Sequence, residues 1–390
     1  MQVLESLPPS DCLAPILSLL VSFIFTSLAL NVSQGHRIYF LLPILVPAII
    51  SFLAINSLDL IFTGLGQLWG HSLIVYIVHN TSVLFLEQWV LHPDNEEAGR
   101  KWDHRAAYKI WGNPQLINTS REAPGAHKAD PNISRITFVR NRAIQIICLC
   151  LVEKYVASRI FPGAFTPLSL WDFSPHRKVY LRRLPYFEVS TRETLLRSAL
   201  AFRWIWLNFL GLHIAQTAVA ILFSVILRWD EASEWPVLFG NPLDVWSLRR
   251  LWGKFWHRIV YRPYISWGLL LSRRLPGIGP GSSEEKAFVA CFVFLLSGVS
   301  HALVTWRGFG CGYSGDILWF FMNSIATMLE TAVIKMYQKS VTKSNQRGWL
   351  FLIHNYGLDK LGGFVWVFGF MFWSVPKWEY GKVWCVAHQI

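Results

Sequence analysis

Two stretches of this sequence decide how the rest of the chain is interpreted. The first is Asn241-Pro-Leu-Asp-Val-Trp-Ser-Leu-Arg-Arg-Leu-Trp-Gly-Lys-Phe-Trp-His-Arg258, which is basic and rich in tryptophan. The second is Phe294-Leu-Leu-Ser-Gly-Val-Ser-His301, which places one imidazole inside an apolar run. An ionisable side chain such as histidine is rare in an apolar membrane helix, and where it occurs it usually has a function.

The composition favours a membrane protein. The chain has 390 residues, of which 53% are hydrophobic and 15% are charged, with 20 Trp. A soluble protein has about 25% charged residues. Several apolar runs approach the roughly 20 residues that cross a bilayer, and tryptophan is typical of the two membrane interfaces. The sequence therefore predicts an all-α, polytopic integral membrane protein, with a helical bundle around a buried cavity.

We expect about eight transmembrane helices in one domain. The expected spans are residues 13–30, 38–55, 72–91, 136–160, 195–229, 287–306, 316–334 and 361–375. No internal repeat and no linker divides the chain, so residues 1–390 are predicted to form a single domain with a motif-bearing core at 241–306. The run 195–229 is too long for one straight span and predicts a kinked, tilted or partly interfacial helix.

The positive net charge does not by itself decide which kind of partner the protein binds. The formal net charge of +12 suggests a nucleic-acid partner, but no nucleic-acid-binding motif accompanies it. Lys and Arg cluster beside the apolar runs, which indicates anchoring at the cytoplasmic face. Attraction to membrane lipid headgroups, or to a polyanionic cosubstrate such as coenzyme A, is the alternative. The six cysteines have no metal-ligand spacing, so no metal is expected.

His301 is the strongest single candidate for a functional residue. An ionisable group at membrane depth is costly and usually faces the interior of the bundle. Ser297 lies one helical turn before it and Thr305 one turn after it, so the three side chains share one face. This stripe predicts a polar wall of a cavity. The alternative is a packing histidine that is satisfied by a backbone carbonyl, and periodicity does not separate the two.

Residues 247–262 have the pattern of an amphipathic helix. The apolar positions are Leu248, Leu251, Trp252, Phe255 and Ile259, and the basic positions on the other side are Arg250, Lys254 and Arg258. The pattern alone favours an interfacial helix with basic headgroup anchors. The functional alternative is a strip that binds the phosphates of a cosubstrate.

Together the two stretches resemble the wax synthase branch of the membrane-bound O-acyltransferases. The residues that carry the resemblance are Ser247-Leu-Arg, Leu251-Trp-Gly-Lys-Phe-Trp-His257 and, about 40 residues later, Phe294-Leu-Leu-Ser-Gly-Val-Ser-His301. The apolar run that ends in Met328-Leu-Glu330 is similar to fungal members that acetylate terpenoid and meroterpenoid alcohols. Two positions depart from the family, since Leu251 stands where Phe is commoner and Lys254 replaces an Arg.

The resemblance implies an O-acyltransferase of fungal secondary metabolism. It would move an acyl group, acetyl in the fungal members, from acyl-CoA to a hydroxyl of a hydrophobic terpenoid or meroterpenoid acceptor. His301 matches the catalytic histidine of the family, and His257 matches its second polar position. Contacts to substrate or acyl-CoA are expected from Ser297, Trp252, Trp256, Arg250, Lys254 and Arg258. No bound cofactor is expected, with acetyl-CoA or another acyl-CoA as cosubstrate.

The chemistry of ester formation fits these residues. An alcohol is a poor nucleophile at neutral pH, so its attack on a thioester needs a base within hydrogen-bond reach. Burial disfavours a charged imidazole, so a buried His301 is expected to be neutral and to have an acceptor nitrogen for the proton. His257 would orient the substrate or donate to the thioester oxyanion. This scheme needs neither a metal nor an acyl-enzyme.

Three other functions stay open. A wax-ester synthase would use a long-chain alcohol instead of a terpenoid. A membrane terpene cyclase would protonate its substrate from a lone carboxylic acid such as Glu330 or Glu87. A transporter would place His301 in a substrate or proton path, but the sequence has no inverted repeat. The acceptor, the acyl chain length and the oligomeric state cannot be predicted.

The cellular location is predicted only in outline. The resemblance implies a multi-pass protein of the endoplasmic reticulum. Asn31, Asn118 and Asn132 each begin an Asn-x-Ser/Thr sequon and are possible glycan acceptors if their loops face a lumen. The sequon at Asn80 lies inside an apolar run and is interpreted as a chance match.

Overall fold

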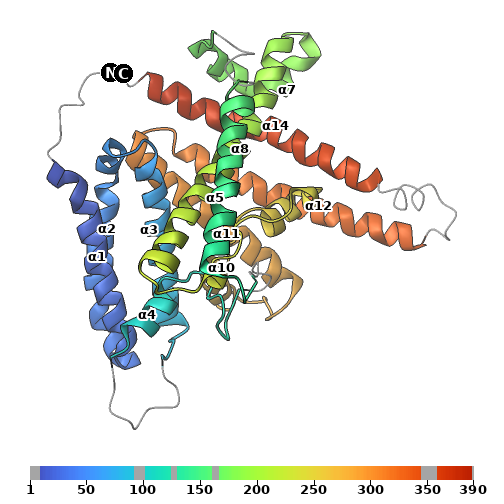
Figure 1. Ribbon diagram of the computed structural model, residues 1–390. Coiled ribbons are helices and arrows are strands. Elements are labelled where there is room, and N and C mark those ends of the chain that lie inside the picture. The colour runs from blue at the N-terminus through green and yellow to red at the C-terminus, as the bar shows by residue number, and fades with distance from the viewer. Residues whose placement is uncertain (1–8, 92–101, 124–129, 160–166, 344–357, 389–390) are drawn as a thin grey trace. The chain divides into compact units, whose positions relative to one another are not determined.

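The computed structural model describes residues 9–91, 102–123, 130–159, 167–343 and 358–388, and every regular element in these ranges is a helix. Figure 1 shows the helices and their order. A helix satisfies its own backbone polar groups, which is what an apolar run needs inside a bilayer. Six helices are long and apolar enough to cross a membrane: Cys12–Asn31, Gln34–Leu53, Thr191–Ile226, Ser283–Phe309, Ser314–Ser340 and Leu358–Ala387. The predicted all-α, polytopic membrane fold is confirmed.

The predicted number of eight spans is not confirmed. The region 72–91 corresponds to α3 (Leu65–Thr81) followed by a π-helical turn at Ser82–Leu86. The region 136–160 corresponds to α5 (Arg135–Val152) with a π-helical turn at Glu153–Ala157. Neither is among the six helices that are long and apolar enough to span. The first is short, about 25 Å at 1.5 Å per residue, and the second carries charged side chains.

The chain divides into two compact units, which are described separately below. Unit 1 consists of residues 1–126 and 258–321, and unit 2 consists of residues 127–257 and 322–390. The two segments of the motif core, 241–257 and 258–306, therefore fall in different units. The prediction that residues 1–390 act as one catalytic domain stays a prediction.

Unit 1 is built around α3. Its helices are α1 (Pro9–Asn31), α2 (Leu41–Leu53), α3, α4 (His104–Trp111), α10 (Tyr261–Ser272), α11 (Ser283–Phe309) and the first residues of α12 (Ser314–Lys343). α1 packs against α2 and α4, and α3 packs against α2, α10 and α11 (Figure 1). The apolar core between α1, α2 and α3 contains Leu19, Ala48, Ile55, Leu73 and Tyr76.

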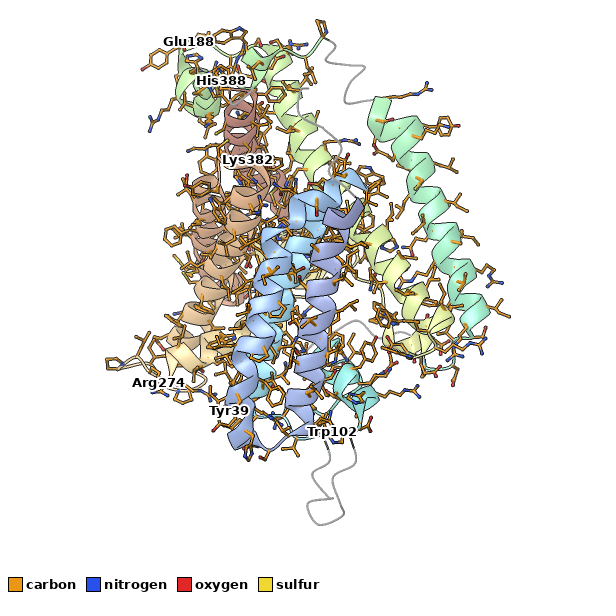
Figure 2. The ribbon with its side chains drawn as sticks, turned by 90° about the vertical axis from the view of Figure 1, so that its left-hand side faces the viewer. Tyr39, Trp102, Glu188, Arg274, Lys382 and His388 are labelled. Atoms are coloured by element: carbon orange, nitrogen blue, oxygen red, sulfur yellow. The ribbon has the colours of Figure 1, made fainter. Side chains whose placement is uncertain are left out.

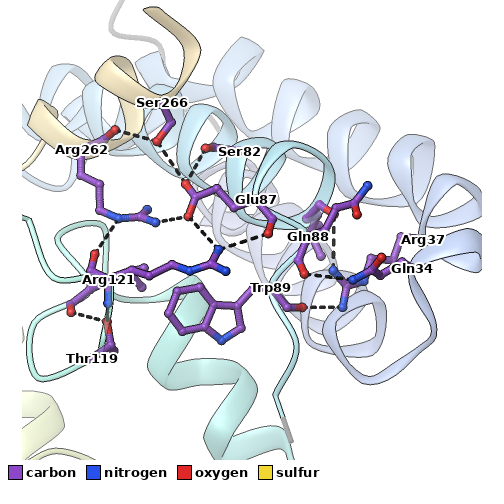
Figure 3. Close-up of polar contacts among 12 residues, drawn as sticks. Gln34, Arg37, Ser82, Glu87, Gln88, Trp89, Thr119, Arg121, Arg262 and Ser266 are labelled. Carbon is purple, nitrogen blue, oxygen red and sulfur yellow. Dashed lines mark hydrogen bonds and ion pairs between the residues drawn. The ribbon is translucent and has the colours of Figure 1, made fainter. Parts of the chain in front are cut away.

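A charged network holds the carboxyl end of α3 to α10 in unit 1. Glu87 accepts hydrogen bonds from Ser82 Oγ (2.9 Å) and Ser266 Oγ (3.1 Å) and forms an ion pair with Arg262. The Arg262 Nε also donates to the Arg121 carbonyl at 3.1 Å (Figure 3). The opposite charges of Glu87 and Arg262 compensate each other, and both groups have further hydrogen-bond partners. The network therefore anchors α10 beside α3.

One end of unit 1 is basic. Tyr39, Trp102 and Arg274 lie toward the same end in Figure 2, and the segments there carry the basic residues Arg37, Arg105, Lys109, Arg121, Arg273 and Arg274. At the opposite end, residues 54–64 contain no Lys or Arg and residues 306–313 contain only Arg307. The positive-inside rule favours the cytoplasmic side for the basic end.

Unit 2 is organised by α8 (Thr191–Ile221), the longest helix of the described residues. It packs against α5 and α14 (Leu358–Ala387), and the unit also contains α7 (Tyr180–Arg183), α9 (Leu248–Arg250) and the remainder of α12. Arg197 is fully buried and donates to the carbonyls of Arg177 (3.0 Å) and Trp373 (3.1 Å). The predicted run 195–229 corresponds to α8, which is continuous to Ile221 and is extended by a π-helical turn to Ile226.

Candidate active site

In unit 1, a glycine brings α12 close to the helix that carries His301. A Cβ added at Gly298 would lie 3.0 Å from Ile317 Cα and 3.1 Å from Phe320 Cβ, so only glycine fits there without a shift. His301 follows three residues later on the same helical face. Its ring centroid lies 4.7 Å from that of Phe320. The half-buried imidazole is thus held against an aromatic ring.

A second histidine, which the sequence analysis missed, lies beside His301. The ring centroids of His71 and His301 are 4.2 Å apart. A Cβ at Gly70 would lie 3.1 Å from Val304 Cγ2, so α3 and α11 approach closely at this point. Gly66 and Gly70 form the small-xxx-small spacing that allows membrane helices to pack. That spacing, followed directly by His71, was the signal in the sequence that pointed to the pair.

One hydroxyl of the predicted polar stripe, that of Ser297, is bonded within its own helix. Ser297 Oγ donates to the Val293 carbonyl at 2.8 Å. Ser300, which the stripe did not include, lies 2.7 Å from the Tyr264 hydroxyl. Thr305 is buried. A serine that donates to its own helix keeps free acceptor lone pairs, so Ser297 can still accept a hydrogen bond, and its contact with substrate stays a prediction.

In unit 2, the motif segment does not form the predicted helix over 247–262. α9 covers one turn and is followed by a π-helical turn, Leu251–Phe255, which closes with a hydrogen bond of 2.7 Å from Trp256 N to the Leu251 carbonyl. Trp256 is then extended, with φ −64° and ψ 152°. Single π-helical turns are frequent at functional sites. The predicted apolar face is correct for Leu248, Leu251 and Phe255, which are buried.

A contact from earlier in the chain explains why the helix ends. Gly240 N donates to the Phe255 carbonyl at 2.9 Å, so this carbonyl is satisfied without a further helical turn. A Cβ at Gly240 would lie only 2.2 Å from the Lys254 carbonyl oxygen. Gly240 therefore permits residues 239–240 to lie against the π-helical turn, and this tertiary contact overrides the helical periodicity.

Glu330 holds the start of the motif segment. Its carboxylate accepts from Leu248 N (2.6 Å), Arg249 N (3.1 Å) and Trp366 Nε1 (2.8 Å), and the residue is only 7% exposed. The first N–H groups of a helix have no partner within the helix, so the carboxylate satisfies them. The carboxylate of Glu330, like that of the ion-paired Glu87, is thus engaged by structural partners.

His257 follows the helix break and lies outside the six candidate spans. Phe239 meets its ring edge-on at 6.2 Å between centroids, and Nδ1 is buried without a hydrogen-bond partner among the described residues. Burial lowers the pKa of His257 to about 4, so the ring is neutral near pH 7. A neutral imidazole has one N–H donor and one acceptor nitrogen, which suits a donor to developing negative charge.

The two tryptophans of the motif pack inside unit 2. Trp252 Nε1 donates to Asn323 Oδ1 at 3.1 Å. Trp256 stacks on Trp204 with 5.5 Å between centroids and 5° between planes. Trp378 meets Trp204 edge-on at 5.6 Å. Aromatic clusters of this kind stabilise packing, so both motif residues have a structural role, and their contact with substrate stays a prediction.

The three basic residues of the motif do not form one helical face. Arg250 is ion-paired with Asp244 and lies 4.4 Å above the Trp246 ring. Arg258 lies 4.1 Å above the ring of Tyr261. Lys254 is exposed. The predicted strip with an i+4 repeat is wrong because the helix ends at Phe255, and phosphate binding by the individual side chains stays a prediction.

The three sequons differ in accessibility. Asn118 and Asn132 are exposed. The Asn31 amide is engaged, since Nδ2 donates to the Ser27 carbonyl (2.8 Å) and Oδ1 accepts from Asp103 N (2.9 Å). Asn31 and Asn118 also lie in the segments of the basic end of unit 1. Glycosylation at all three asparagines stays a prediction, and the charge distribution disfavours it at these two.

In the described ranges, no group of three or more His, Cys, Asp or Glu side chains gathers as ligands of an ion would. The candidate residues described above include three imidazoles. The two rings in contact in unit 1 are on apolar helices, and the ring in unit 2 is on a helix break.

Comparisons with known proteins place this region in context. The sequence pattern of the Membrane bound O-acyl transferase family matches residues 235–323, which contain both motif stretches. The chain is 30% identical to the acetyltransferase spyB of Aspergillus fumigatus over 204 residues, which are 50% of this chain and 34% of the relative. It is 30% identical to the acetyltransferase atnC of an Arthrinium species over 48% of this chain and 41% of the relative.

A longer match is with the acetyltransferase aurG of Calcarisporium arbuscula, 25% identical over 69% of this chain and 62% of the relative. The chain thus spans about a third to two thirds of the length of these relatives. No solved structure matches it significantly. The predicted resemblance to membrane-bound O-acyltransferases, and to fungal acetyltransferases in particular, is confirmed.

Proposed function

We propose that this chain is an O-acyltransferase that moves an acyl group from acyl-CoA to a hydroxyl of a hydrophobic acceptor in a membrane. The observation that carries the proposal is the histidine at position 301, which lies inside the matched region 235–323 on an apolar helix and contacts the ring of His71. A histidine held in apolar surroundings is the group that ester formation from an alcohol needs.

In the proposed reaction, His301 removes the proton of the acceptor hydroxyl as the oxygen attacks the thioester carbonyl. The C–O bond forms, and the carbonyl oxygen becomes an oxyanion. The intermediate then collapses, the C–S bond breaks, and the leaving thiolate takes the proton from the His301 imidazolium. Atoms and charges balance without a metal or an acyl-enzyme, and the products are an ester and free coenzyme A.

His257 acts in this proposal as the hydrogen-bond donor to the oxyanion or to the acceptor. Its lowered pKa, about 4, makes it a poor base but keeps it a neutral donor at pH 7. The π-helical turn before it and the Phe239 ring beside it fix the imidazole, so that little reorganisation is needed during the reaction.

His71 is proposed as a positioning residue for His301. Its ring lies in contact with the catalytic candidate, and the glycine before it determines how closely the two helices approach. A neighbouring ring that restricts the rotamer of a base keeps it in the reactive geometry, where misplacement by 1 Å can cost about 100-fold in rate.

The donor is proposed more narrowly from the names of the relatives, and the acceptor from the resemblance of the sequence to fungal acetyltransferases. Acetyl-CoA is the proposed donor because the relatives spyB, atnC and aurG are called acetyltransferases. A terpenoid or meroterpenoid alcohol of fungal secondary metabolism is the proposed acceptor, and the endoplasmic reticulum is the proposed membrane. The long-chain alcohol of a wax-ester synthase is the second candidate acceptor.

The test is acetyl transfer in microsomes that contain wild type or His301→Ala at equal protein level. Radiolabelled acetyl-CoA is supplied with a panel of terpenoid alcohols and, in parallel, with a long-chain alcohol. We expect labelled ester from wild type and a loss of about 100-fold or more in the variant. Undiminished ester formation by His301→Ala would remove this residue from the mechanism.

The same assay separates the alternatives. Ester from the long-chain alcohol alone would identify a wax-ester synthase. A cyclised, unesterified product that forms equally well in His301→Ala would identify a terpene cyclase. Because Glu87 and Glu330 are held by ion pairs or by three N–H donors, we expect no such product.

A further inference from the structure

A second group of polar side chains in unit 2 is buried without partners. Arg142 (5% exposed), His213 (2%) and Thr217 (3%) are buried, and Gln216 is half-buried. Arg142 Nη1, both ring nitrogens of His213, Gln216 Oε1 and Thr217 Oγ1 have no hydrogen-bond partner among the described residues. More than nine in ten buried polar groups are satisfied in folded proteins, so five such atoms in one place require an explanation.

The geometry brings these side chains together. His213, Gln216 and Thr217 are spaced at i, i+3 and i+4 on α8, so they share one helical face. Gln216 Nε2 and Arg142 Nη2 donate to the same Pro236 carbonyl, at 2.8 Å and 3.0 Å. Arg142, which α5 supplies, therefore meets the α8 side chains at one carbonyl, and its charge acts on the His213 ring.

Arg142 carries a positive charge that no carboxylate balances among the described residues. Its printed partners are the carbonyls of Trp235 (2.7 Å) and Pro236 and the ring of Phe138. A buried charge without a counter-ion is costly. The Arg142 guanidinium, the Thr217 hydroxyl and the His213 imidazole are the kinds of hydrogen-bond donor that recognise an anionic oxygen group such as a carboxylate or a phosphate.

Two aromatic rings connect this group to the motif. His213 stacks on Phe209 (5.7 Å between centroids), Phe209 contacts Phe239 (4.8 Å), and Phe239 contacts His257 (6.2 Å). Within unit 2, a chain of aromatic contacts therefore runs from the buried polar group to the imidazole at the helix break. A molecule with an apolar body and an anionic end matches this order of polar and aromatic side chains.

We propose that Arg142, His213, Gln216 and Thr217 form a binding site for the oxyanion of a substrate whose apolar part lies along Phe209 and Phe239. The choice of substrates rests on the proposed function. The oxyanion is then either a carboxylate on the acceptor alcohol or a phosphate of the acyl-CoA, and both are recognised by the same guanidinium and hydroxyl donors.

The site is tested by equilibrium binding to the purified full-length chain in detergent, which does not require catalysis. The two probes are tritiated coenzyme A and tritiated 12-hydroxyoctadecanoate, with the unlabelled methyl ester of the latter as a competitor. The main variant is Gln216→Glu, which supplies an internal carboxylate to Arg142 and so occupies the site without leaving a buried charge unpaired. The second variant is Thr217→Val, which removes one hydroxyl at nearly constant shape.

We expect Gln216→Glu to weaken binding of one probe at least about 10-fold, and Thr217→Val to weaken the same probe by a smaller factor. Gln216→Glu pairs the buried guanidinium but loses the hydrogen bond that Gln216 Nε2 donates to the Pro236 carbonyl, so its melting temperature without ligand should stay close to that of wild type. Arg140→Gln is the matched control, because Arg140 is exposed on the same helix and should leave both affinities unchanged.

Each outcome has one meaning. A loss confined to 12-hydroxyoctadecanoate, with no competition by its methyl ester, assigns the site to an acceptor carboxylate. A loss confined to coenzyme A assigns it to a phosphate. Equal affinities of wild type and Gln216→Glu for both probes, or binding of neither probe, would overturn the proposal. A chain that binds a probe in this manner but forms no ester would contradict the proposed function and leave the site standing.

Discussion

His301 and His257 are held by two different kinds of structure. His301 lies in the second half of α11, an uninterrupted helix of 27 residues, and close packing at Gly70 and Gly298 fixes its neighbours. His257 follows the point where the helical segment ends in a π-helical turn, and a backbone contact with Gly240 determines where it ends. The first histidine is positioned by regular helix packing and the second by an irregular turn. The face on which a residue lies in a regular helix can be predicted from the sequence period, whereas the conformation of the turn before His257 depends on one contact with a residue elsewhere in the chain.

The first prediction uses pH to test the environment of His257. Its folded pKa is about 4, below the ordinary value of about 6.5. Between these values the unfolded chain binds the proton and the folded chain does not, so the free energy of unfolding falls as the pH falls from about 6.5 to 4, by up to about 3 kcal/mol. His257→Asn removes this contribution. Urea unfolding of both proteins in detergent should diverge only below about pH 6.5; parallel curves would show that the imidazole is not buried in solution.

The second prediction tests the helix break directly. Gly240→Ala places a Cβ against the Lys254 carbonyl and should displace the π-helical turn and His257 with it. We expect acetyl transfer to fall about 100-fold, because misplacement of a catalytic group by about 1 Å costs this much. Gly253→Ala is the matched control: it lies inside the same turn, and a Cβ there meets nothing within 4 Å. Equal activity of the two variants would mean that the close approach of Gly240 does not position His257.

The third prediction tests the packing around His301. Gly298→Leu pushes side-chain atoms into Ile317 and Phe320, and overpacking of this kind costs about 1–3 kcal/mol. Gly308→Leu, in the same helix, has open space at its Cβ and should be neutral or slightly stabilising, since leucine favours helix. Melting temperatures of both variants in the same detergent measure the difference. If the two leucines have the same effect, α11 and α12 do not approach closely at this point.

The fourth prediction concerns His71. As a positioning residue it should affect turnover more than binding, so His71→Ala should lower kcat about 10-fold with little change in KM. His71→Phe keeps a ring against His301 and should restore part of the loss. Steady-state kinetics with acetyl-CoA gives both constants. A change in KM alone, or no rescue by phenylalanine, would contradict a role through ring contact.

The sequence predicted the parts of this structure that depend on local patterns. Hydropathy alone located the six long apolar helices, because length and composition determine whether a segment can span a bilayer. The position of His301 on a helical face followed from a regular period of 3.6 residues, which α11 keeps throughout. The buried positions Leu248, Leu251 and Phe255 were correct for the same reason.

The remaining features depend on contacts between distant segments. The helix over 247–262 was expected to continue, but Gly240 satisfies the Phe255 carbonyl from 15 residues earlier in the chain. His71 was missed because its partner lies 230 residues later in the sequence. Glu330 appeared as a lone acid in an apolar run, and only its three N–H donors reveal it as a capping group. A single sequence contains none of these pairings explicitly.

The most direct test of the central claim is a double-mutant comparison of His301→Ala and His257→Ala. Acetyl transfer rates of wild type, both single variants and the double variant are measured with purified protein and one accepted alcohol. Groups that serve one transition state are strongly non-additive. We predict that each single variant loses about 100-fold or more and that the double variant is little slower than the slower single variant. A double variant whose loss equals the product of the two single losses, or a single variant with wild-type activity, would contradict a shared role of the two histidines in acyl transfer.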